Sequence, residues 1–185
     1  MCRPMSFIAL IGISLVGTPI QVAGNESEER EPAVPADLKV PAGHQLLFKV
    51  EAKGVQIYKS VAGNGNTPEW AFDAPLADLF DRNGKKVGCH YEGPSWESSD
   101  GSKVKKQDEK GAVKLKEAPN PKEDIPWLLI KVKAEEGQKG AFSMATYIQR
   151  IRTKGGKPPA DVPVRTGTKV GVEYRAFYYF YGPAD

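Results

Sequence analysis

The stretch 90–102 carries the densest group of side chains that could take part in chemistry. It places one of the two histidines of the chain beside an aromatic pair, two glutamates and an aspartate. A glycine and a proline bend the same stretch, and bent loops on a rigid scaffold commonly display binding or catalytic groups. The candidate binding residues are therefore His90, Tyr91, Trp96, Glu97 and Asp100.

Two of these carboxylates suggest a hydrolase that acts on a glycan-type substrate. A glycosidase uses two carboxylates about 5–10 Å apart on either side of the sugar bond, and Glu97 and Asp100 would supply them. Against this, acidic residues in turns usually bind backbone amides or face water, and Asp100 is followed by Gly101 in a common turn pair. The extracytoplasmic hydrolase is therefore an alternative, and we assign no catalytic residue.

Other reaction types find no support in the residue pattern. His44 and His90 show no short ligand spacing, so we expect no metal site. The chain has neither a Gly-x-Ser-x-Gly turn nor a Gly-x-Gly-x-x-Gly unit for a dinucleotide, and we expect no cofactor. Two interpretations of the stretch stay open: it binds a glycan, a small molecule or a cell-surface partner, or Trp96 fills the core and the role is structural.

Residues 1–24 have the layout of a secretory signal peptide. Arg3 precedes an apolar run at 7–16, and small residues end the segment, which is the order of charged region, apolar region and cleavage site. The apolar run is too short to span a bilayer as a helix. We place cleavage after Ala23 or Gly24 and expect a secreted or periplasmic protein without a membrane span.

Cleavage would leave a nearly balanced chain with one cysteine. The remaining 25 basic and 23 acidic residues give a net charge near +2, which does not indicate a nucleic-acid-binding protein. Cys89 alone cannot form a disulfide within the chain, so it is either a buried apolar residue or an exposed thiol. We favour the buried state, because an exposed thiol is a liability in an oxidising compartment.

The rest of the chain divides into a short linker and one domain. Residues 25–39 are rich in glutamate and proline and carry few apolar side chains, a composition that does not compensate for the entropy lost on ordering. We predict a disordered linker at 25–39 and a single domain over 40–185.

The first half of this domain shows the alternation of β-strands. Turn residues separate the apolar segments, including Lys53 and Gly54, which we interpret as a turn. In the first strand one face holds Leu46, Phe48, Val50 and Ala52. The strands expected here are 45–52, 54–60, 69–74 and 85–91.

The second half continues the β pattern. The basic stretch 103–116 alternates lysines with apolar residues, which predicts a hairpin that turns near 108–111 and has one solvated face. Three long strands follow at 125–135, 141–153 and 169–181. Many strands, frequent Gly and Pro turns and no long helical pattern predict an all-β fold, a single-domain antiparallel β-sandwich or barrel.

Short motifs follow one another in a specific order along the domain. They occupy 40–49, 54–59, 70–72, 77–81, 88–102, 125–129, 147–151, 153–156 and 178–181. This arrangement resembles the secreted family of unknown function catalogued as DUF3455, and the resemblance covers essentially all of residues 40–181. It implies an exported domain whose activity is uncharacterised.

The chain departs from that family at two positions. Relatives often carry a cysteine where this chain has Ser60, and a second one in a longer, histidine-bearing insertion where this chain has 158–167. The resemblance implies that these cysteines pair in the relatives, so this chain lacks that disulfide.

Overall fold

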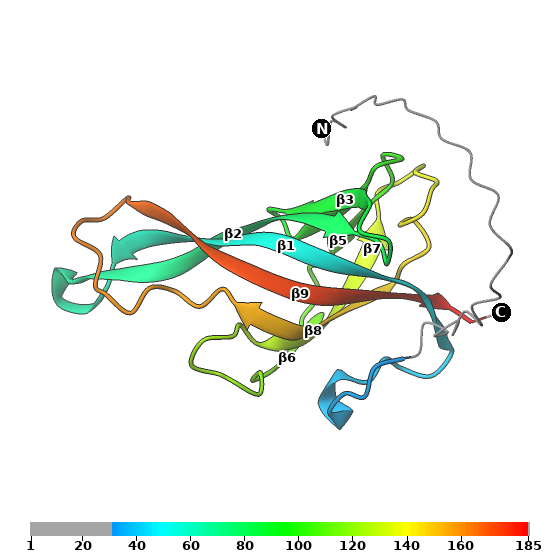
Figure 1. Ribbon diagram of the computed structural model, residues 1–185, viewed down its shortest axis with the longest axis horizontal. Coiled ribbons are helices and arrows are strands. Elements are labelled where there is room, and N and C mark those ends of the chain that lie inside the picture. The colour runs from blue at the N-terminus through cyan, green and yellow to red at the C-terminus, as the bar shows by residue number, and fades with distance from the viewer. Residues whose placement is uncertain (1–30, 185) are drawn as a thin grey trace, which may run out of the picture.

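The computed structural model describes residues 31–184, so the expected signal peptide at 1–24 lies outside the described residues. Nine strands and two short 3-10 helices make up this part of the chain (Figure 1). No helix within the described range has the length and apolar character that crossing a bilayer requires. The elements are η1 (Ala36–Leu38), β1 (His44–Ala62), η2 (Asn64–Asn66), β2 (Pro68–Phe80), β3 (Lys86–Tyr91), β4 (Ser95–Ser98), β5 (Lys103–Lys106), β6 (Val113–Lys116), β7 (Trp127–Ala134), β8 (Tyr147–Gly155) and β9 (Lys169–Pro183).

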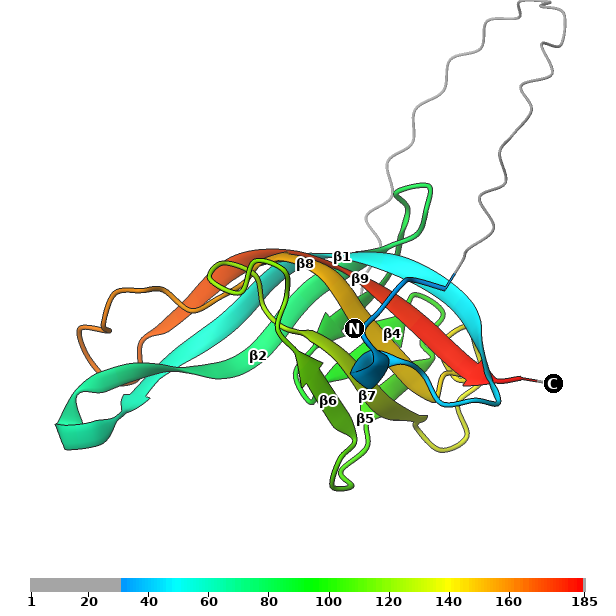
Figure 2. The same ribbon diagram turned by 90° about the horizontal axis from the view of Figure 1, so that it is seen from below.

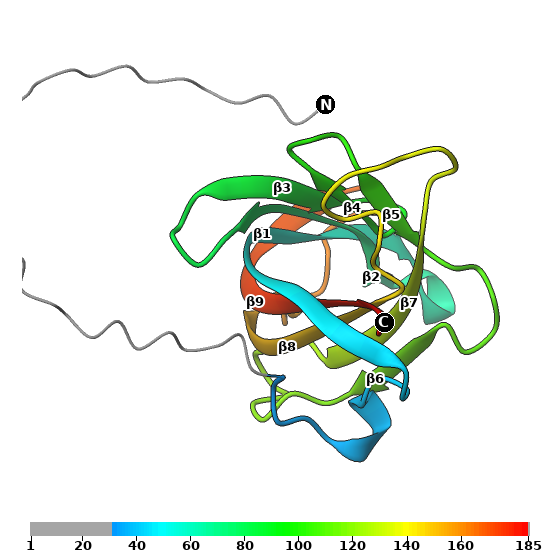
Figure 3. The same cartoon turned by 90° about the vertical axis from the view of Figure 1, so that its right-hand side faces the viewer.

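All nine strands belong to one antiparallel sheet that closes into a ring. Neighbours pair in the order β5-β4-β3-β2-β1-β9-β8-β7-β6, and β5 pairs in addition with β7. The sheet curls over itself when seen from below (Figure 2), and the strands encircle a central core in the end-on view (Figure 3). The all-β fold expected from the alternation is confirmed, and a single sheet encloses the core.

β1 runs through the position where we expected a turn. The sequence suggested two strands separated by Lys53 and Gly54, but β1 is one strand of 19 residues. A Cβ atom on Gly54 would lie 2.1 Å from the carbonyl oxygen of Leu76 and 2.4 Å from the Cα of Ala77. The glycine therefore marks a close approach of the β2 backbone and not a turn.

Three strands extend beyond the ring as an arm (Figure 1). β1, β2 and β9 contain 19, 13 and 15 residues, and the next longest strand contains 9. The indole of Trp70 on this arm donates to the carbonyl oxygen of Asp161 at 2.9 Å. The amide of Gly167 donates to the carbonyl oxygen of Ser60 at 2.8 Å, so Ser60 and the stretch 158–167 are neighbours in space.

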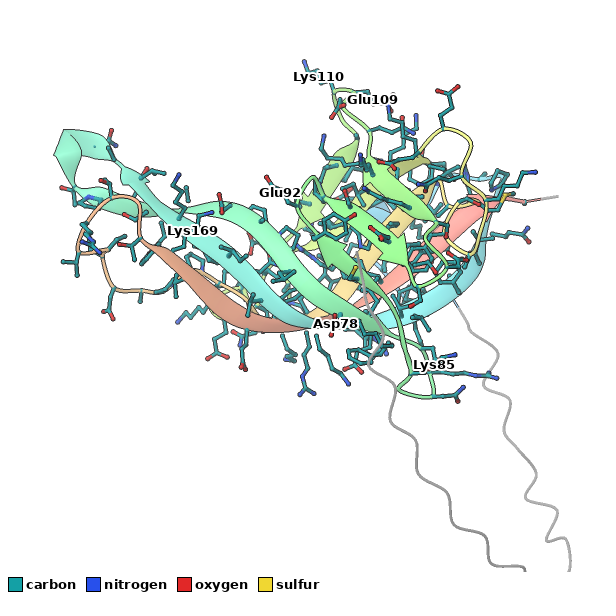
Figure 4. The ribbon with its side chains drawn as sticks, turned by 90° about the horizontal axis from the view of Figure 1, so that it is seen from above. Asp78, Lys85, Glu92, Glu109, Lys110 and Lys169 are labelled. Atoms are coloured by element: carbon teal, nitrogen blue, oxygen red, sulfur yellow. The ribbon has the colours of Figure 1, made fainter. Side chains whose placement is uncertain are left out.

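The lysine-rich stretch 103–116 does not form the expected hairpin. Within the described sheet its strands β5 and β6 pair with β7 and not with each other, β6 beside 127–130 and β5 beside 132–134. Both short strands fit end to end along β7 because β7 is longer than either. Glu109 and Lys110 mark the loop that projects between them (Figure 4). The strands were predicted correctly, and their pairing was wrong.

The strand expected at 141–153 begins later, at Tyr147. Its first residues form turns, because side chains of another loop bind their amides. The amide of Ala141 donates to the carboxylate of Asp100 at 2.8 Å, and the amide of Phe142 donates to the hydroxyl of Ser102 at 3.0 Å. These amides are therefore not available to a sheet ladder.

The side chains that face the inside of the ring form the main core. Phe48, Phe142 and Phe180 pack against one another there, with ring centroids 4.5–5.2 Å apart. The buried face predicted for the last strand is confirmed over its second half, at Tyr174, Ala176, Tyr178 and Phe180.

A bulge in β1 changes which residues face inward. The pairing of β1 with β9 shifts register between Leu46 and Phe48, so these two side chains do not share a face as the alternation suggested. Phe48 packs against the inner core, whereas Leu46 joins a second cluster with Tyr179 and Tyr181 on the outer surface.

The described part of the expected linker, 31–39, packs against this outer surface. Leu38 is fully buried, and its carbonyl oxygen accepts a hydrogen bond from Nε2 of Gln149 at 2.6 Å. Val34 packs on the outer cluster. The few apolar side chains of this Pro-rich segment are thus enough to place it on the sheet, which the overall composition did not predict.

Candidate functional site

The hairpin of β3 and β4 separates the candidate residues into an inner and an outer set. The two strands pair with His90 opposite Trp96 and with Cys89 opposite Glu97. Because side chains alternate along a strand, His90 and Trp96 point into the ring, where both border a cavity. Tyr91 and Glu97 point outward and contact each other.

His90 and Trp96 form a buried aromatic platform inside the ring. Their rings are stacked, with centroids 4.3 Å apart and 9° between the planes. Tyr178 of β9 meets the two rings edge-on, at centroid distances of 5.2 and 5.8 Å. Only 3% of His90 and 1% of Trp96 is exposed, so both residues belong to the core as well as to the cavity wall.

Burial keeps the imidazole of His90 neutral. Its Nδ1 lies 2.8 Å from the carbonyl oxygen of Ser95, and because a carbonyl only accepts, Nδ1 carries the hydrogen. Desolvation lowers the pKa of His90 to about 3; the bond to Ser95 acts in the opposite direction, and the charge of Arg150 lowers the pKa further. His90 therefore adds no positive charge to the interior at neutral pH.

A cavity of about 450 Å³ lies beside this platform, where the arm meets the ring. Its lining includes side chains from all nine strands and is mostly apolar and aromatic. Phe72 and Leu115, which are 53% and 61% exposed, stand at its mouth. The volume and the lining are typical of sites that hold small organic molecules.

Three polar groups of lining residues that are able to donate are buried and have few partners in the described part of the chain. They are Nε2 of Gln56, Nε1 of Trp96 and the hydroxyl of Tyr178. Leaving such a group unsatisfied costs about 1–3 kcal/mol, and native proteins contain few of them. Gln56 and Tyr178 interact with the buried hydroxyl of Tyr174, so Nε1 of Trp96 is the donor among these three that no described residue satisfies.

Arg150 brings a positive charge to the same wall. It lies on β8, opposite Leu128 of β7 and Tyr178 of β9. Its Nε and Nη2 both donate to the carbonyl oxygen of Pro126, at 3.3 and 2.9 Å. Among residues 31–184, Arg150 takes part in no ion pair.

Tyr91 and Glu97 form a polar pair on the outer surface. The hydroxyl of Tyr91 donates to Oε2 of Glu97 at 2.5 Å, and Nζ of Lys103 lies 5.5 Å from the centre of the Tyr91 ring. Partial burial and then the bond to Glu97 raise the pKa of Tyr91. Nζ of Lys103 also lies 3.4 Å from the carboxylate of Glu135. The side chains of Tyr91, Glu97 and Lys103 therefore connect β3, β4 and β5 to the end of β7.

Asp100 holds two loops together. Its carboxylate accepts the amide and the hydroxyl of Ser102 at 2.9 and 2.6 Å, and the amide of Ala141 at 2.8 Å. The hydroxyl of Ser102, followed by the amide of Ala141, lowers the pKa of Asp100 to about 2. Neither Asp100 nor Glu97 borders the inner cavity, so the two carboxylates do not converge there.

The remaining candidates lie apart from one another. His44 packs edge-on against Tyr147 at the start of β1, with centroids 4.9 Å apart, whereas His90 is inside the ring. Residues 31–184 contain no group of three His, Cys, Asp or Glu side chains that could hold a metal ion. Cys89 is half-buried, not fully buried as we expected, because its position on β3 alternates with the inward-facing His90.

Sequence reasoning missed the polar residues that line the cavity, above all Gln56 and Arg150. The sequence carried no usable signal for Arg150, because Arg152 and Lys154 share its strand parity and are exposed.

The chain belongs to the family described as Protein of unknown function (DUF3455), whose model matches residues 41–182. The match includes nearly the whole closed sheet and confirms the resemblance seen in the motifs. No curated protein and no solved structure matches the chain. The family assigns no activity, and the function therefore has to be inferred from the cavity.

Proposed function

We propose that this protein is a binding module that holds a small organic molecule in the cavity inside the ring. The observation that carries the proposal is a mostly apolar cavity of about 450 Å³ whose wall carries the donors of Gln56, Trp96 and Tyr178, with that of Trp96 unsatisfied. A ligand with acceptor groups would satisfy these donors, and its apolar part would pack on the aromatic platform. The enclosed apolar lining favours such a molecule over a glycan or a cell-surface partner.

We propose as well that the protein acts outside the cytoplasm, as a secreted or periplasmic protein. The support is the sequence pattern of residues 1–24. Expression of the full chain in a bacterial host, followed by mass spectrometry of the exported fraction, should show an N-terminus at Gly24 or Asn25. An uncleaved chain that remains in the cytoplasm would contradict this part of the proposal.

An uncharged fluorescent probe tests the cavity. N-phenyl-1-naphthylamine should bind the protein with increased fluorescence, because its aromatic rings transfer from water to the apolar lining. Val113 borders the cavity from the edge strand β6 and is 38% exposed, so Val113→Trp should fill the mouth without disturbing the core. We expect probe affinity to fall about tenfold or more, which corresponds to about 1.4 kcal/mol.

Lys114→Trp is the matched control. Lys114 is the next residue of β6 and is exposed on the opposite side of the strand, so the same indole added there should leave probe affinity unchanged. Equal effects of the two substitutions, or no probe binding to the unsubstituted protein, would contradict the proposal.

The glycan hydrolase is the second candidate, and its support is weaker. It requires Glu97 and Asp100 to converge on one pocket, whereas the first contacts Tyr91 on the outer surface and the second binds loop amides. Its test is the double substitution Glu97→Gln with Asp100→Asn, assayed by glycan hydrolysis.

A further inference from the structure

We propose that the cavity ligand is an aromatic anion, with a carboxylate or a similar acidic group held at Arg150. This inference rests on the proposed cavity function and adds the chemical class of the ligand. Three independent properties of the cavity carry it: the sign of its charges, the hydrogen-bonding state of its polar atoms, and the shape of its aromatic wall.

The charged residues that border the cavity are both basic. They are Lys106 and Arg150, and no acidic residue of the described chain lines the cavity with them. Lys106 already lies 3.4 Å from the carboxylate of Asp108, so its charge is partly compensated. Arg150 has no such partner within residues 31–184. A half-buried cation without a counter-ion favours an anionic ligand.

The guanidinium of Arg150 is held in place for this role. Nε and Nη2 share the carbonyl oxygen of Pro126, which orients the plane of the group. A guanidinium carries five N–H donors, so further donors remain for a ligand. A carboxylate fits such a donor set well, because arginine and carboxylate form two parallel charge-assisted hydrogen bonds.

The polar donors of the cavity wall also indicate an anionic ligand. Nε1 of Trp96 leaves a donor unused, and Gln56 and Tyr178 engage the hydroxyl of Tyr174, so a ligand that is rich in acceptors would complete the hydrogen bonding of these groups. A cationic or donor-rich ligand would leave them unsatisfied and would be repelled by Arg150.

The aromatic part of the ligand is indicated by the platform. The parallel rings of His90 and Trp96, with Tyr178 edge-on to both, form a wall of aromatic surface. Planar rings pack on such surfaces in offset-stacked or edge-to-face arrangements. Because His90 is neutral, this wall contributes apolar area without adding charge.

Two molecules of almost the same shape test the inference. 1-Naphthoate and 1-naphthamide differ mainly in the charge of one group, and isothermal titration calorimetry at neutral pH measures both affinities. We expect the purified protein to bind naphthoate about ten- to hundredfold more tightly than naphthamide, the range typical of a hydrogen-bonded charged group. Equal affinities, or tighter binding of naphthamide, would overturn the inference.

Substitution of Arg150 tests whether this residue causes the preference for naphthoate. Arg150→Met should remove the preference for naphthoate and leave the affinity for naphthamide within about threefold, while Arg150→Lys, which keeps the charge, should retain part of the preference. Lys85→Met is the control, because it removes an exposed positive charge at the β2–β3 hairpin (Figure 4), and Lys85 does not border the cavity. A preference that persists in folded Arg150→Met would contradict the role of Arg150.

The outcomes separate this inference from the cavity proposal. If both naphthalene ligands bind equally and Val113→Trp weakens both, the cavity function holds and the anion inference fails. If neither ligand nor the uncharged fluorescent probe binds, the cavity function itself fails. The affinity ratio of the unsubstituted protein is informative even if an Arg150 variant does not fold.

Discussion

The imidazole of His90 lies flat against the indole of Trp96 inside the ring, with 4.3 Å between the centroids and 9° between the planes. Because desolvation keeps this imidazole neutral, the pair is an uncharged aromatic surface. Arg150, the charged group of the cavity that has no ion-pair partner among residues 31–184, lies on β8, whereas the aromatic pair lies on β3 and β4. Apolar and ionic contacts with a ligand are therefore provided by different strands and are separable by substitution.

Replacing His90 should change how stability depends on pH. In the folded chain the pKa of His90 is about 3, and its ordinary value is 6.5. Between these values the unfolded chain binds a proton that the folded chain does not, so stability falls as pH decreases below 6.5. His90→Phe, which keeps an aromatic ring, should remove this loss, which amounts to about 1.4 kcal/mol per pH unit. Urea unfolding at pH 7, 6, 5 and 4 measures the free energy of unfolding of both proteins.

The informative quantity is the stability difference between the unsubstituted protein and the variant. The variant should become steadily more stable relative to the unsubstituted protein as the pH falls, because all other titrating groups are common to both proteins. His44→Phe controls for the loss of a histidine outside the ring. A difference that stays constant from pH 7 to 4 would show that His90 is not buried in its neutral form.

Gly54→Ala should destabilise the protein strongly. The new methyl group would meet the β2 backbone at Leu76 and Ala77 at less than 2.5 Å, so the two strands would have to separate locally. We expect a loss of about 3 kcal/mol, at the upper end of overpacking effects. Gly171→Ala on β9 is the control, since its methyl group would meet only the side chain of Val55, at 3.3 Å. Thermal and urea unfolding compare the two.

Asp100→Ala should lower stability without affecting the cavity. It removes the acceptor of two Ser102 groups and of the Ala141 amide, which should cost about 1–3 kcal/mol at neutral pH. The pKa of Asp100 is lowered to about 2 from 3.8, so this contribution is present above pH 3.8 and is lost as the pH falls to 2. Unfolding at pH 7 and at pH 2.5 tests this, with Asp108→Ala as the exposed control.

Glu97→Gln should leave ligand binding unchanged. Glu97 faces outward, where its carboxylate accepts the Tyr91 hydroxyl, and it does not border the cavity. The affinity of N-phenyl-1-naphthylamine should therefore stay within about twofold of the original value, which is below 0.5 kcal/mol. A tenfold loss of probe affinity would indicate that Glu97 takes part in ligand binding and would support the hydrolase alternative.

The alternation of apolar residues predicted most strands because burial on one face repeats every second residue. It failed where a bulge breaks that repeat, as between Leu46 and Phe48. It also misassigned Gly54, because a close approach of two backbones and a turn both require glycine. Local patterns cannot distinguish the two without knowledge of the neighbouring strand.

The pairing of strands was harder to predict than the strands themselves. Nothing in the lysine-rich stretch 103–116 indicates that β5 and β6 share the edge of β7, because a period of two identifies faces and not neighbours. The same limit applies to the cavity: His90 and Trp96 were identified as candidates, but the closing of the ring adds Gln56 and Arg150 to them. These residues lie far apart in the sequence and meet only in the folded sheet.

β1 and β9 pair along most of their length in the middle of the sheet, although they are the first and the last strands among residues 31–184. During synthesis β1 leaves the ribosome well before the strand that it pairs with is made. The central ladder cannot form until residues 169–183 have emerged, and contacts of such long sequence separation form slowly. A chain that ends before β9 therefore lacks a strand from the middle of its sheet.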